Sequence, residues 1–490
     1  MKKAIILLAL IPTLCFGQWV QFGSDIDGET AGDACGYSTA ISSDGSIVAI
    51  GANFNQGNGS AAGHVRIFEN SGGVWTQIGS DIDGDPGDQT GQYVSLSDDG
   101  SIVAVGEPIS AINGSLAGQV RVFRNVNNVW TQIGNSINGD SFNWQTGSVS
   151  LSADGSILAV GSRGADVTGI GPFTGKARIY ENQSGNWVQI GNDINGFALN
   201  DFFGISVNLS SDGSTVAVGA IGDIFNSDTG YVSVFKNNGG TWNQIGSNIN
   251  GTSPGGEFGN SVSLSADGLV VATGERLDIS GKGLTQVYKN VGGNWTQIGS
   301  NILGENVGDQ FGQSVALSDS GNILVSGARR NDGNGIDAGR TYVFENLGGN
   351  WVLINSSIDG EAAGDQAGFS VCISANGAII ATGAIQNDGN GNNAGHVRIY
   401  ENNSVLSINE FENERQVEFY PNPTANFIQI STEFDIISFE IISVTGMIIA
   451  KEVVYNQNQL RIGMTDLSQG VYLIRLNSKY SIHFIKIIKQ

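Results

Sequence analysis

The feature that most constrains this chain is a unit of about 55 residues that occurs seven times along most of its length. Each copy opens with a tryptophan, and successive tryptophans stand 53 to 57 residues apart. The seven are Trp19, Trp75, Trp130, Trp187, Trp242, Trp295 and Trp351. A period this regular indicates a repeat architecture, in which each unit covers its apolar faces with its neighbours.

Each copy contains three further apolar runs, which in the sixth copy are Gln313 to Ser318, Asn322 to Ala328 and Arg340 to Phe344. The runs are short, rich in Val, Ile, Tyr and Phe, and bounded by Asp-Gly, Gly-Gly or Asn-Gly pairs, which is typical of strands joined by turns. The second run is apolar almost throughout, as expected of a strand covered on both faces. Each copy is therefore predicted to be a four-stranded antiparallel meander.

Four-stranded sheets that pack radially form a β-propeller, and seven copies fall within the usual range of about 4 to 8 blades. An open solenoid is the alternative. The strand order favours a ring, because a tryptophan strand at Trp19 to Gly23 begins the chain and the last set ends at His396 to Asn403 without one. If the N-terminal strand pairs beside His396 to Tyr400, it closes the ring and leaves no sheet edge unpaired at the seam.

The copies also follow a known pattern, which reads F-G-x-S-V-x-L-S-x-D-G, then A-G-x-V-x-V-F, then W-x-Q. Matches are Phe258-Gly259, Phe311-Gly312, SVSLSADG at Ser261 to Gly268, and the AGHVRIF that ends at Phe68. In these residues the chain resembles bacterial FG-GAP-type repeats, which are related to the propeller of integrin α-subunits. The resemblance covers nearly all of residues 18–403 and implies a propeller, but it implies little about activity. The third copy departs most, with Trp144 and Gln145 near the Phe-Gly position, so its inner strand is expected to start differently.

Residues 1–17 are predicted to be a secretory signal peptide, because Lys2 and Lys3 precede an apolar run that ends in a small-residue cleavage site. Lipidation of Cys15 is the alternative, although Leu14 stands where a lipobox needs a small residue. No later segment reaches the roughly 18 consecutive apolar residues that cross a bilayer, so we expect no membrane span.

Two further cysteines, Cys35 and Cys372, fall in the first and last copies. Alignment of the copies places them five positions apart along the inner strand, beyond the roughly 7 Å Cα separation that a disulfide allows. We therefore predict two buried thiols, with a disulfide as the alternative.

The charge of the chain excludes some partners. The sequence has 23 Lys and Arg, 46 Asp and Glu, and a net charge of −23 at pH 7. Only 7 of the basic and 9 of the acidic residues follow residue 403, so the acidic excess lies in the repeats. Such a surface repels nucleic acid and anionic lipid. We predict no nucleic-acid partner.

Acidic residues gather in two classes of loop. The first follows each tryptophan strand, as at Asp25 to Glu29, where Asp-Gly and Asn-Gly pairs are typical of tight turns. The second joins the second and third strands, and in the sixth copy Asp332, Asn334 and Asp337 space their oxygens as Ca²⁺ ligands can be spaced. This loop lacks the closing bidentate acid of a strong calcium loop, so turn chemistry remains the alternative. No other cofactor is predicted.

The sequence contains no H-E-x-x-H or paired Cys-x-x-Cys motif. His64 and His396 recur at one repeat position, which is typical of structural residues, and His483 lies near the C-terminus. Two carboxylates that converge on the propeller channel could form a glycosidase site, since such enzymes need two. The acids, however, recur in turns. The sequence therefore favours a binding protein over an enzyme.

After Asn403 the repeat stops, and the residues from Val417 onward form short apolar runs that predict a compact β-sandwich. Characteristic residues are YPNP (Tyr420, Pro421, Asn422, Pro423), Val444-Thr445-Gly446, Leu467 with Gly470-Val471-Tyr472, and the closing KIIK from Lys486 to Lys489. In these residues the tail closely resembles the type A C-terminal sorting domain of the type IX secretion system of Bacteroidetes. The resemblance implies recognition by that machinery, passage through the outer membrane, and commonly removal of the tail with surface attachment or release. An Ig-like accessory domain without sorting activity is the alternative.

The predicted fold class is all-β: a seven-bladed β-propeller closed by the N-terminal strand, followed by a small Ig-like β-sandwich. The predicted parts are a signal peptide at 1–17, the propeller at 18–403, a linker at 404–416 and the sorting domain at 417–490. The predicted function is a secreted or cell-surface binding or adhesion module for extracellular glycan or protein. The alternative is a secreted polysaccharide hydrolase or lyase that acts in the propeller channel.

Overall fold

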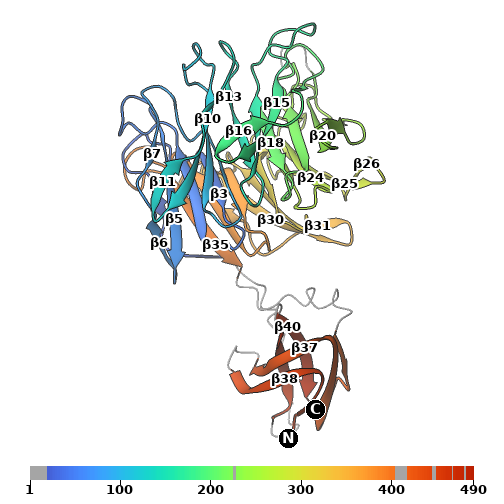
Figure 1. Cartoon of the computed structure of the whole chain (residues 1–490). Coiled ribbons are helices and arrows are strands. Elements are labelled where there is room, and N and C mark those ends of the chain that lie inside the picture. The colour runs from blue at the N-terminus through green and yellow to red at the C-terminus, as the bar shows by residue number, and fades with distance from the viewer. Residues whose placement is uncertain are drawn as a thin grey trace, which may run out of the picture. The chain divides into compact units, whose positions relative to one another are not determined.

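The computed structural model describes residues 19–223, 228–402, 417–443, 448–465, 467–478 and 482–489. The predicted signal peptide, the predicted linker and Gly446 lie outside the described residues. Contacts divide the chain into two units, Met1–Asn403 and Ser404–Gln490. Every helix or strand in the described residues is a β-strand, which confirms the all-β class (Figure 1).

Each repeat sheet combines the three apolar strands of one copy with the tryptophan strand that opens the next copy, as the sixth repeat illustrates. β28 (Phe311–Leu317), β29 (Ile323–Ala328), β30 (Arg340–Leu347) and β31 (Asn350–Leu353) pair in chain order, so the four predicted strands are confirmed. The sequence did not predict a fifth strand, β32 (Ile358–Asp359), which pairs with the start of β30. Two residues are too few to show an alternating pattern, and tertiary burial of the isoleucine holds them in place.

The same order recurs in the other repeats. The first has β3 (Ser38–Ile41), β4 (Ile47–Ala52), β5 (His64–Ser71), β6 (Val74–Gln77) and β7 (Ile82–Asp83), and the second has β8 (Tyr93–Leu96), β9 (Ile102–Glu107), β10 (Gln119–Val126), β11 (Val129–Gln132) and β12 (Ile137–Asn138). The third has β13 (Thr146–Leu151), β14 (Ile157–Ser162), β15 (Lys176–Gln183), β16 (Asn186–Gln189) and β17 (Ile194–Asn195), and the fourth has β18 (Ser206–Leu209), β19 (Thr215–Ala220), β20 (Tyr231–Asn237), β21 (Trp242–Gln244) and β22 (Ile249–Asn250). The fifth has β23 (Ser261–Leu264), β24 (Val270–Glu275), β25 (Leu284–Val291), β26 (Asn294–Gln297) and β27 (Ile302–Leu303), and the last has β33 (Ala367–Ile373), β34 (Ile379–Ala384) and β35 (His396–Asn402).

The sheet of the last repeat takes its outer strands from the start of the chain. β1 (Trp19–Gln21) pairs with β35, with Trp19 opposite Asn402, and β2 (Ile26–Asp27) pairs with its beginning. β3 contacts both β33 and β34, and Figure 1 shows the orange strands of the last repeat next to the blue strands of the first. The N-terminal residues thus take the edge place that a tryptophan strand takes in the other sheets.

Backbone hydrogen bonds link the hairpins that join the first and second strands of the repeats. Their N–H to C=O pairs run Ser43 to Asp98, Asp98 to Ala153, Ala153 to Ser211, Ser211 to Ala266, Ala266 to Asp319, Asp319 to Ala375 and Ala375 to Ser43, at 2.8 to 3.0 Å. The series ends on the residue where it began. Each sheet is therefore hydrogen-bonded to the next one through the hairpin between its first and second strands.

Glycine allows the sheets to approach this closely. A Cβ built on Gly383 of β34 would lie 2.2 Å from the carbonyl oxygen of Gly36, which precedes β3. The equivalent contact between Gly219 and Gly259 measures 2.0 Å. Any side chain here would push neighbouring sheets apart, which explains the glycine of the A-V-G and F-G sequences in physical terms.

The third repeat corrects one detail of the sequence alignment. Gly118 bridges to Thr146, as Gly283 bridges to Phe311, so Thr146-Gly147 holds the Phe-Gly position rather than Trp144 and Gln145. The ring of Trp144 instead stacks under the ammonium of Lys176 at 4.5 Å. The threonine is a β-branched residue that suits the same strand start.

The C-terminal unit consists of β36 (Val417–Tyr420), β37 (Phe427–Ser443), β38 (Ile448–Gly463), β39 (Gly470–Ser478) and β40 (Ile482–Lys489). The pairing joins all five into one sheet with the path β36-β37-β39-β40 and with β38 on β37. The predicted strand FIQIS and residues 439–443 of the predicted strand FEIISV lie in the single strand β37, because residues 432–438 between them stay extended through register shifts after Ser431. One apolar cluster, which includes Ile430, Ile474 and Ile487, forms the core.

Candidate functional site

The three residues predicted to bind calcium lie in the loop between β29 and β30. The Asp332 carboxylate accepts a hydrogen bond from the Asp337 backbone N–H at 2.9 Å. The Asn334 amide donates to the carbonyl oxygens of Gly360 and Glu361 at 2.9 and 2.7 Å. The loop brings the three residues together, and two of them also hold it in shape. Calcium binding at this loop stays a prediction.

In four repeats an Asn-Gly loop is hydrogen-bonded to the connection that follows its sheet. In the sixth repeat Asn331 donates to the Asp309 carboxylate at 2.8 Å, while Asn334 reaches across to the following connection. The equivalents of the second bond are Asn58 to Gly84, Asn113 to Gly139, and Asn390 to Gly28, which joins the last repeat to the first. The polar composition of these loops thus has a structural role.

A cavity of about 260 Å³ lies along the axis, between the first strands of the sheets. Asp98 and Asp319, from the hairpin turns, line the same cavity. The other repeats have Ser or Ala at this position. Both carboxyl groups are exposed, but partial desolvation raises the pKa of each, and the charge of Asp319 raises the pKa of Asp98 further. Two carboxyl groups therefore lie at one end of the channel, and the charge of Asp319 acts on Asp98.

Apolar side chains are exposed at the opposite ends of the sheets. Here lie the loops between the second and third strands and the connections from one sheet to the next. Prominent among the exposed side chains are Ile112, Phe142, Ile170, Phe197, Leu199, Ile279, Val307 and Ile336, of which Ile279 is 87% and Phe142 63% exposed. We name them the loop-end apolar residues. A loop and a connection meet at several of these positions, since a Cβ on Gly171 would lie 2.9 Å from Leu199 and one on Gly281 would lie 3.1 Å from Val307.

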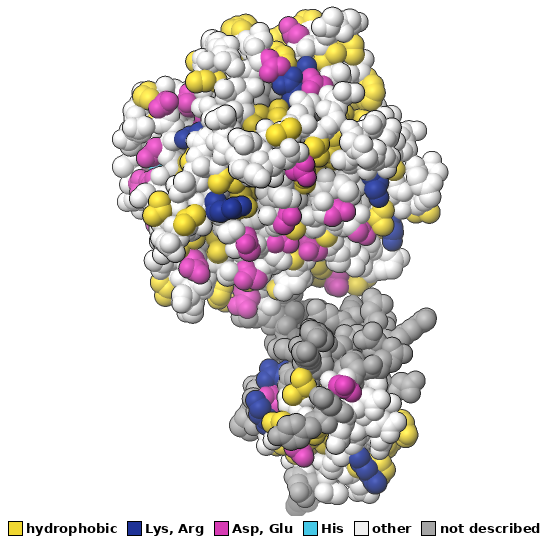
Figure 2. All heavy atoms as spheres, viewed as in Figure 1, with side chains coloured by type: hydrophobic (Ala, Val, Ile, Leu, Met, Phe, Trp, Pro, Cys, Tyr) yellow, Lys and Arg dark blue, Asp and Glu magenta, His cyan; other side chains and the backbone are white. Residues whose placement is uncertain are grey.

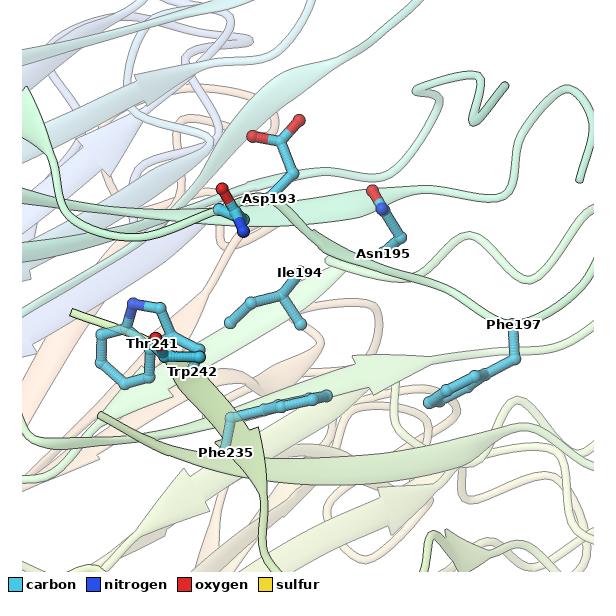
Figure 3. A pocket seen from close by; sticks show the side chains of 8 residues that line it. Asp193, Ile194, Asn195, Phe197, Phe235, Thr241 and Trp242 are labelled. Atoms are coloured by element: carbon cyan, nitrogen blue, oxygen red, sulfur yellow. The ribbon is translucent and has the colours of Figure 1, made fainter. Parts of the chain in front are cut away.

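Phe197 borders a cavity of about 180 Å³ between the third and fourth sheets. Figure 3 shows the side chains of Ile194, Phe235 and Trp242 around it, with the Asp193 carboxylate turned away from these rings. Asp193 instead contacts the guanidinium of Arg178 at 2.8 Å. The other repeats have Glu, Asp or Thr at the position of Phe197. Sequence reasoning missed this aromatic side chain, although the break in the repeat was visible.

Carboxylates are spread over the first unit, and Figure 2 shows more of them than of Lys or Arg on the visible face. This agrees with the net charge of −23. Apolar side chains therefore stand within an anionic surface, which disfavours anionic partners.

The C-terminal unit brings the two ends of its characteristic sequence together. The Asn422 side chain accepts a hydrogen bond from the Ile488 N–H at 2.8 Å, and Thr424 N–H donates to the Ile488 carbonyl at 2.8 Å. Gly470 pairs with Lys489, and Lys486 lies on the same strand opposite Leu473. The opening YPNP therefore sits against the closing KIIK.

Two other tail residues have opposite exposure. Tyr472 is buried, and its hydroxyl donates to the Ser468 carbonyl at 2.9 Å. Tyr420, next to Pro421 and Pro423, is an exposed large side chain of the unit. The first therefore serves the fold, and the second is open to a partner.

Two family models match the chain. Residues 305–344 match the FG-GAP repeat, and residues 418–490 match the secretion system C-terminal sorting domain. No curated protein matches. In the described residues no helix is long and apolar enough to cross a membrane.

Solved structures similar to this chain are distant from it in sequence. Hydrazine synthase of Kuenenia stuttgartiensis is 14% identical over 74% of this chain and 93% of its own, with a TM-score of 0.48. The RRP9 WD40 repeats are 12% identical over 79% and 100%, with a TM-score of 0.48. The periplasmic gluconolactonase PpgL of Pseudomonas aeruginosa is 17% identical over 66% and 85%, with a TM-score of 0.45.

The sorting domain indicates handling by the type IX secretion machinery, and hence export to the outer surface or the medium. Residues from both ends of the matched segment contact each other, because Asn422 of YPNP is hydrogen-bonded to Ile488 of KIIK. The chain thus joins FG-GAP repeat sequence in a β-propeller fold to a type IX C-terminal sorting domain.

Proposed function

We propose that residues 18–403 form a seven-bladed propeller closed by the N-terminal strand, after a signal peptide at 1–17, and that residues 417–490 form a separate sorting domain. The circular series of hairpin hydrogen bonds supports the blade count. The pairing of β1 and β2 with β35 supports the closure. Cross-linking offers a test: cysteines at Val20 and Glu401, which face each other in the register, should form a disulfide within one chain.

For the exported propeller, the function that the surface favours best is binding of an extracellular partner. The observation that carries this proposal is the set of loop-end apolar residues. They lie at the end of the sheets where the loops and connections vary in sequence from one repeat to the next. Exposed apolar side chains mark interaction sites where they gather, and some of these do so where a loop meets a connection, as at Ile170, Gly171 and Leu199. The fold leaves loops free to vary on a fixed scaffold, which is how binding sites are commonly built.

The partner that fits is an uncharged or cationic glycan or protein. Aromatic and aliphatic side chains supply contact area for sugar rings or apolar side chains. The carboxylates around them disfavour nucleic acid and anionic polymers.

A binding screen tests the proposal. The purified full chain is applied to a glycan array and to extracellular matrix proteins, beside the variant Phe142→Ser/Phe197→Ser/Ile279→Ser. We expect a bound class that this variant loses by at least tenfold, since a buried apolar anchor of this size contributes about 1.4 kcal/mol or more to affinity.

A matched control uses exposed valines at the opposite ends of the sheets. Val74→Ser/Val129→Ser/Val291→Ser alters side chains of similar exposure in the β5–β6, β10–β11 and β25–β26 hairpins. This control should bind as the parent does. Binding that both triple variants lose equally, or that neither loses, would contradict the assignment to the loop end.

A second candidate is a polysaccharide hydrolase or lyase that acts in the channel. The specific observation in its favour is the pair Asp98 and Asp319, whose raised pKa values suit one protonated and one ionised carboxyl group. Incubation of the chain with a panel of polysaccharides, followed by reducing-end and unsaturated-product assays, tests it. Turnover that Asp98→Asn and Asp319→Asn abolish would establish an enzyme, and its absence on the panel favours binding alone.

Calcium at Asp332, Asn334 and Asp337 is also proposed. Asp332 and Asn334 are exposed, so a cation has access. A melting temperature that rises with added Ca²⁺ in the parent, but not in Asp332→Ala/Asp337→Ala, would support the site. A melting temperature of the parent that stays the same when Ca²⁺ is added would contradict the calcium site.

A further inference from the structure

Two buried histidines lie among carboxylates at the loop end of the first and last sheets. His64 opens β5 and His396 opens β35, and each side chain is 1% exposed. His64 Nδ1 lies 3.1 Å from Asp81 Oδ2 and 3.9 Å from Glu29 Oε2. In this first group one imidazole nitrogen thus faces two carboxylates from different parts of the chain.

The second group repeats this arrangement. His396 Nδ1 lies 3.6 Å from Asp25 Oδ2 and 3.8 Å from Glu361 Oε2. Asp27 is close as well, because its carboxylate, that of Asp25 and the imidazole offer ligand atoms within 4.8 Å of one another. Each residue of the first group has its counterpart here at the same repeat position.

Neighbouring side chains orient each aspartate in the same way. Gln77 donates to Asp81 Oδ1 at 2.6 Å and leaves Oδ2 toward His64. Gln21 likewise donates to Asp25 Oδ1 and leaves Oδ2 toward His396. Each aspartate therefore has one oxygen held and one aimed at the imidazole.

The glutamates are oriented by arginines. Arg66 Nη1 lies 3.8 Å from Glu29 Oε1, and Arg398 Nη1 lies 3.3 Å from Glu361 Oε1. In both groups the other glutamate oxygen faces the histidine. Side chains that hold metal ligands by their second atom are a common feature of metal sites.

The histidine nitrogens that face these oxygens have no hydrogen-bond partner in the described part of the chain. This is true of Nδ1 in His64 and His396, and of Nε2 in His64. His64 Nδ1 has Asp81 Oδ2 as a close neighbour at 3.1 Å, so the clearer case is His396 Nδ1, whose nearest recorded carboxylate oxygen lies 3.6 Å away. Buried polar atoms in native proteins almost always have a partner. Two such atoms at equivalent places therefore point to a bound species.

Other repeats show what the histidines lack. Lys176 stands at the histidine position of the third repeat, and its ammonium lies 3.1 Å from Asp193 Oδ2. Arg340 stands there in the sixth repeat and pairs with Asp359 and with Glu305 Oε2, the latter at 2.8 Å. A side-chain cation thus offsets the acids in these repeats.

Each histidine has one arginine near its group instead, Arg66 in the first and Arg398 in the second. An imidazole nitrogen that carries no proton has a lone pair that a metal ion can take.

We propose that Glu29, His64 and Asp81 form one zinc site, and that Asp25, Asp27 and His396 form a second, with Glu361 3.8 Å from its histidine. Imidazole nitrogen and carboxylate oxygen are ligands of Zn²⁺, which takes four in a tetrahedron and can leave one position to water. Bonds of about 2.0–2.1 Å in that geometry separate the ligand atoms by roughly 3.3 Å. The histidine-to-carboxylate distances of 3.1 to 3.9 Å lie around this value. A hard cation such as Ca²⁺ would favour oxygen throughout.

Both sites hold the same short stretch of the N-terminal segment. Asp25 and Asp27 serve the site on β35, and Glu29 serves the site on β5. Zinc would therefore fasten residues 25–29 to the last sheet and to the first sheet. The two ions would thus link the first sheet of the repeats to the last one through residues 25–29.

The test counts zinc on the full chain. The purified protein is stripped with EDTA, returned to ZnCl₂, freed of unbound metal and analysed by mass spectrometry of the element. We expect two zinc ions per chain, and a zinc-edge absorption spectrum with imidazole scattering and nitrogen or oxygen neighbours at about 2.0–2.1 Å. Excess Ca²⁺ should leave the zinc in place.

The matched variants copy another repeat of the same protein. His64→Lys and His396→Lys place the third repeat's lysine into each site and should each leave one zinc, and the double variant none. Lys176→Gln alters the equivalent position of the third repeat and should retain both ions. If a lysine variant fails to fold by circular dichroism, Glu29→Gln and Glu361→Gln, which alter exposed side chains, should each weaken one site at least tenfold. Fewer than one zinc on the parent chain, or a count unchanged in the double variant, would overturn the proposal, as would displacement of zinc by equimolar Ca²⁺.

Discussion

Replacement of Trp19 by alanine tests whether the N-terminal strand stabilises the whole ring. Trp19 is 6% exposed and packs in a cluster with Ile380, Tyr400 and Ile358. It opposes Asn402 in the pairing of β1 with β35. The side chain therefore joins the first described residues to the sheet of the last repeat.

The magnitude follows from burial alone. The other six repeat tryptophans donate their indole N–H to a backbone carbonyl of the preceding copy, whereas the Trp19 N–H has no partner in the described residues. Trp19→Ala thus removes packing without breaking a hydrogen bond. We expect the free energy of unfolding to fall by about 3–5 kcal/mol, the range for aromatic-to-alanine changes in cores. Trp19→Phe keeps most of the packing and removes an unpaired donor, so it should cost less than about 1.5 kcal/mol.

Urea unfolding followed by circular dichroism measures both values, with the midpoint compared at constant slope. The control is Val20→Ala on the same strand, where the side chain is 41% exposed and the change should stay within about 0.5 kcal/mol. If Trp19→Ala shifts the midpoint no more than Val20→Ala does, the strand does not hold the ring and the reasoning is wrong. A changed slope would instead mean that the seam opens before the rest unfolds.

Three further predictions concern single positions. Burial raises the pKa of the Cys35 thiol to about 11 and that of Cys372 to about 12, so both should resist Ellman's reagent in the native protein and react in urea; one disulfide after unfolding without reductant would contradict this. Gly219→Ala sets a Cβ 2.0 Å from the Gly259 carbonyl and should lower the free energy of unfolding by about 1–3 kcal/mol, measured by urea. Burial opposes ionisation of Asp193, but Arg178, Gln189 and Lys176 hold its pKa at about 2. Because this pKa is below the value of about 3.9 in an unfolded chain, the stability that the carboxylate adds is full above about pH 4 and lost as the pH falls through 2. The urea midpoint of Asp193→Asn should therefore differ from the parent at pH 6 and converge with it in acid.

Much of the fold was predictable because the same pattern of strand-forming residues recurs in each copy. The second strand of every copy is apolar throughout, and Asp-Gly or Gly-Gly pairs mark its hairpins, so local pattern and tertiary structure agree. β32 was missed because its two residues depend on burial of Ile358 rather than on any period. The separate short strands expected in FIQIS and FEIISV merge in β37, because residues 432–438 between them remain extended instead of forming a turn.

The candidate sites were less predictable because they depend on departures from the repeat. Asp98 and Asp319 differ from Ser or Ala at the same position, and Phe197 differs from Glu, Asp or Thr. Averaging the copies to find strands removes this signal. His64 and His396 were interpreted as structural because they recur. The position carries a cation in only two other repeats, at Lys176 and Arg340, so the sequence contains no clear sign of a metal ligand there.

The seam is where chain entropy and the proposed metal sites act on the same residues. Pairing β1 with β35 closes almost the whole repeat region into one loop. Such long-range pairing forms late in folding, because the chain loses the entropy of loop closure before the new contacts can stabilise it. Neither zinc site is complete until residues 25–29 are seated, since Asp25 needs His396 and Glu29 needs His64. Zinc that binds only the closed ring would stabilise closure by about 2.7 kcal/mol at a free concentration 100 times its dissociation constant. The loss from Trp19→Ala and the gain from zinc should therefore be coupled: zinc should bind the Trp19→Ala variant more weakly than the parent, although Trp19 belongs to neither site.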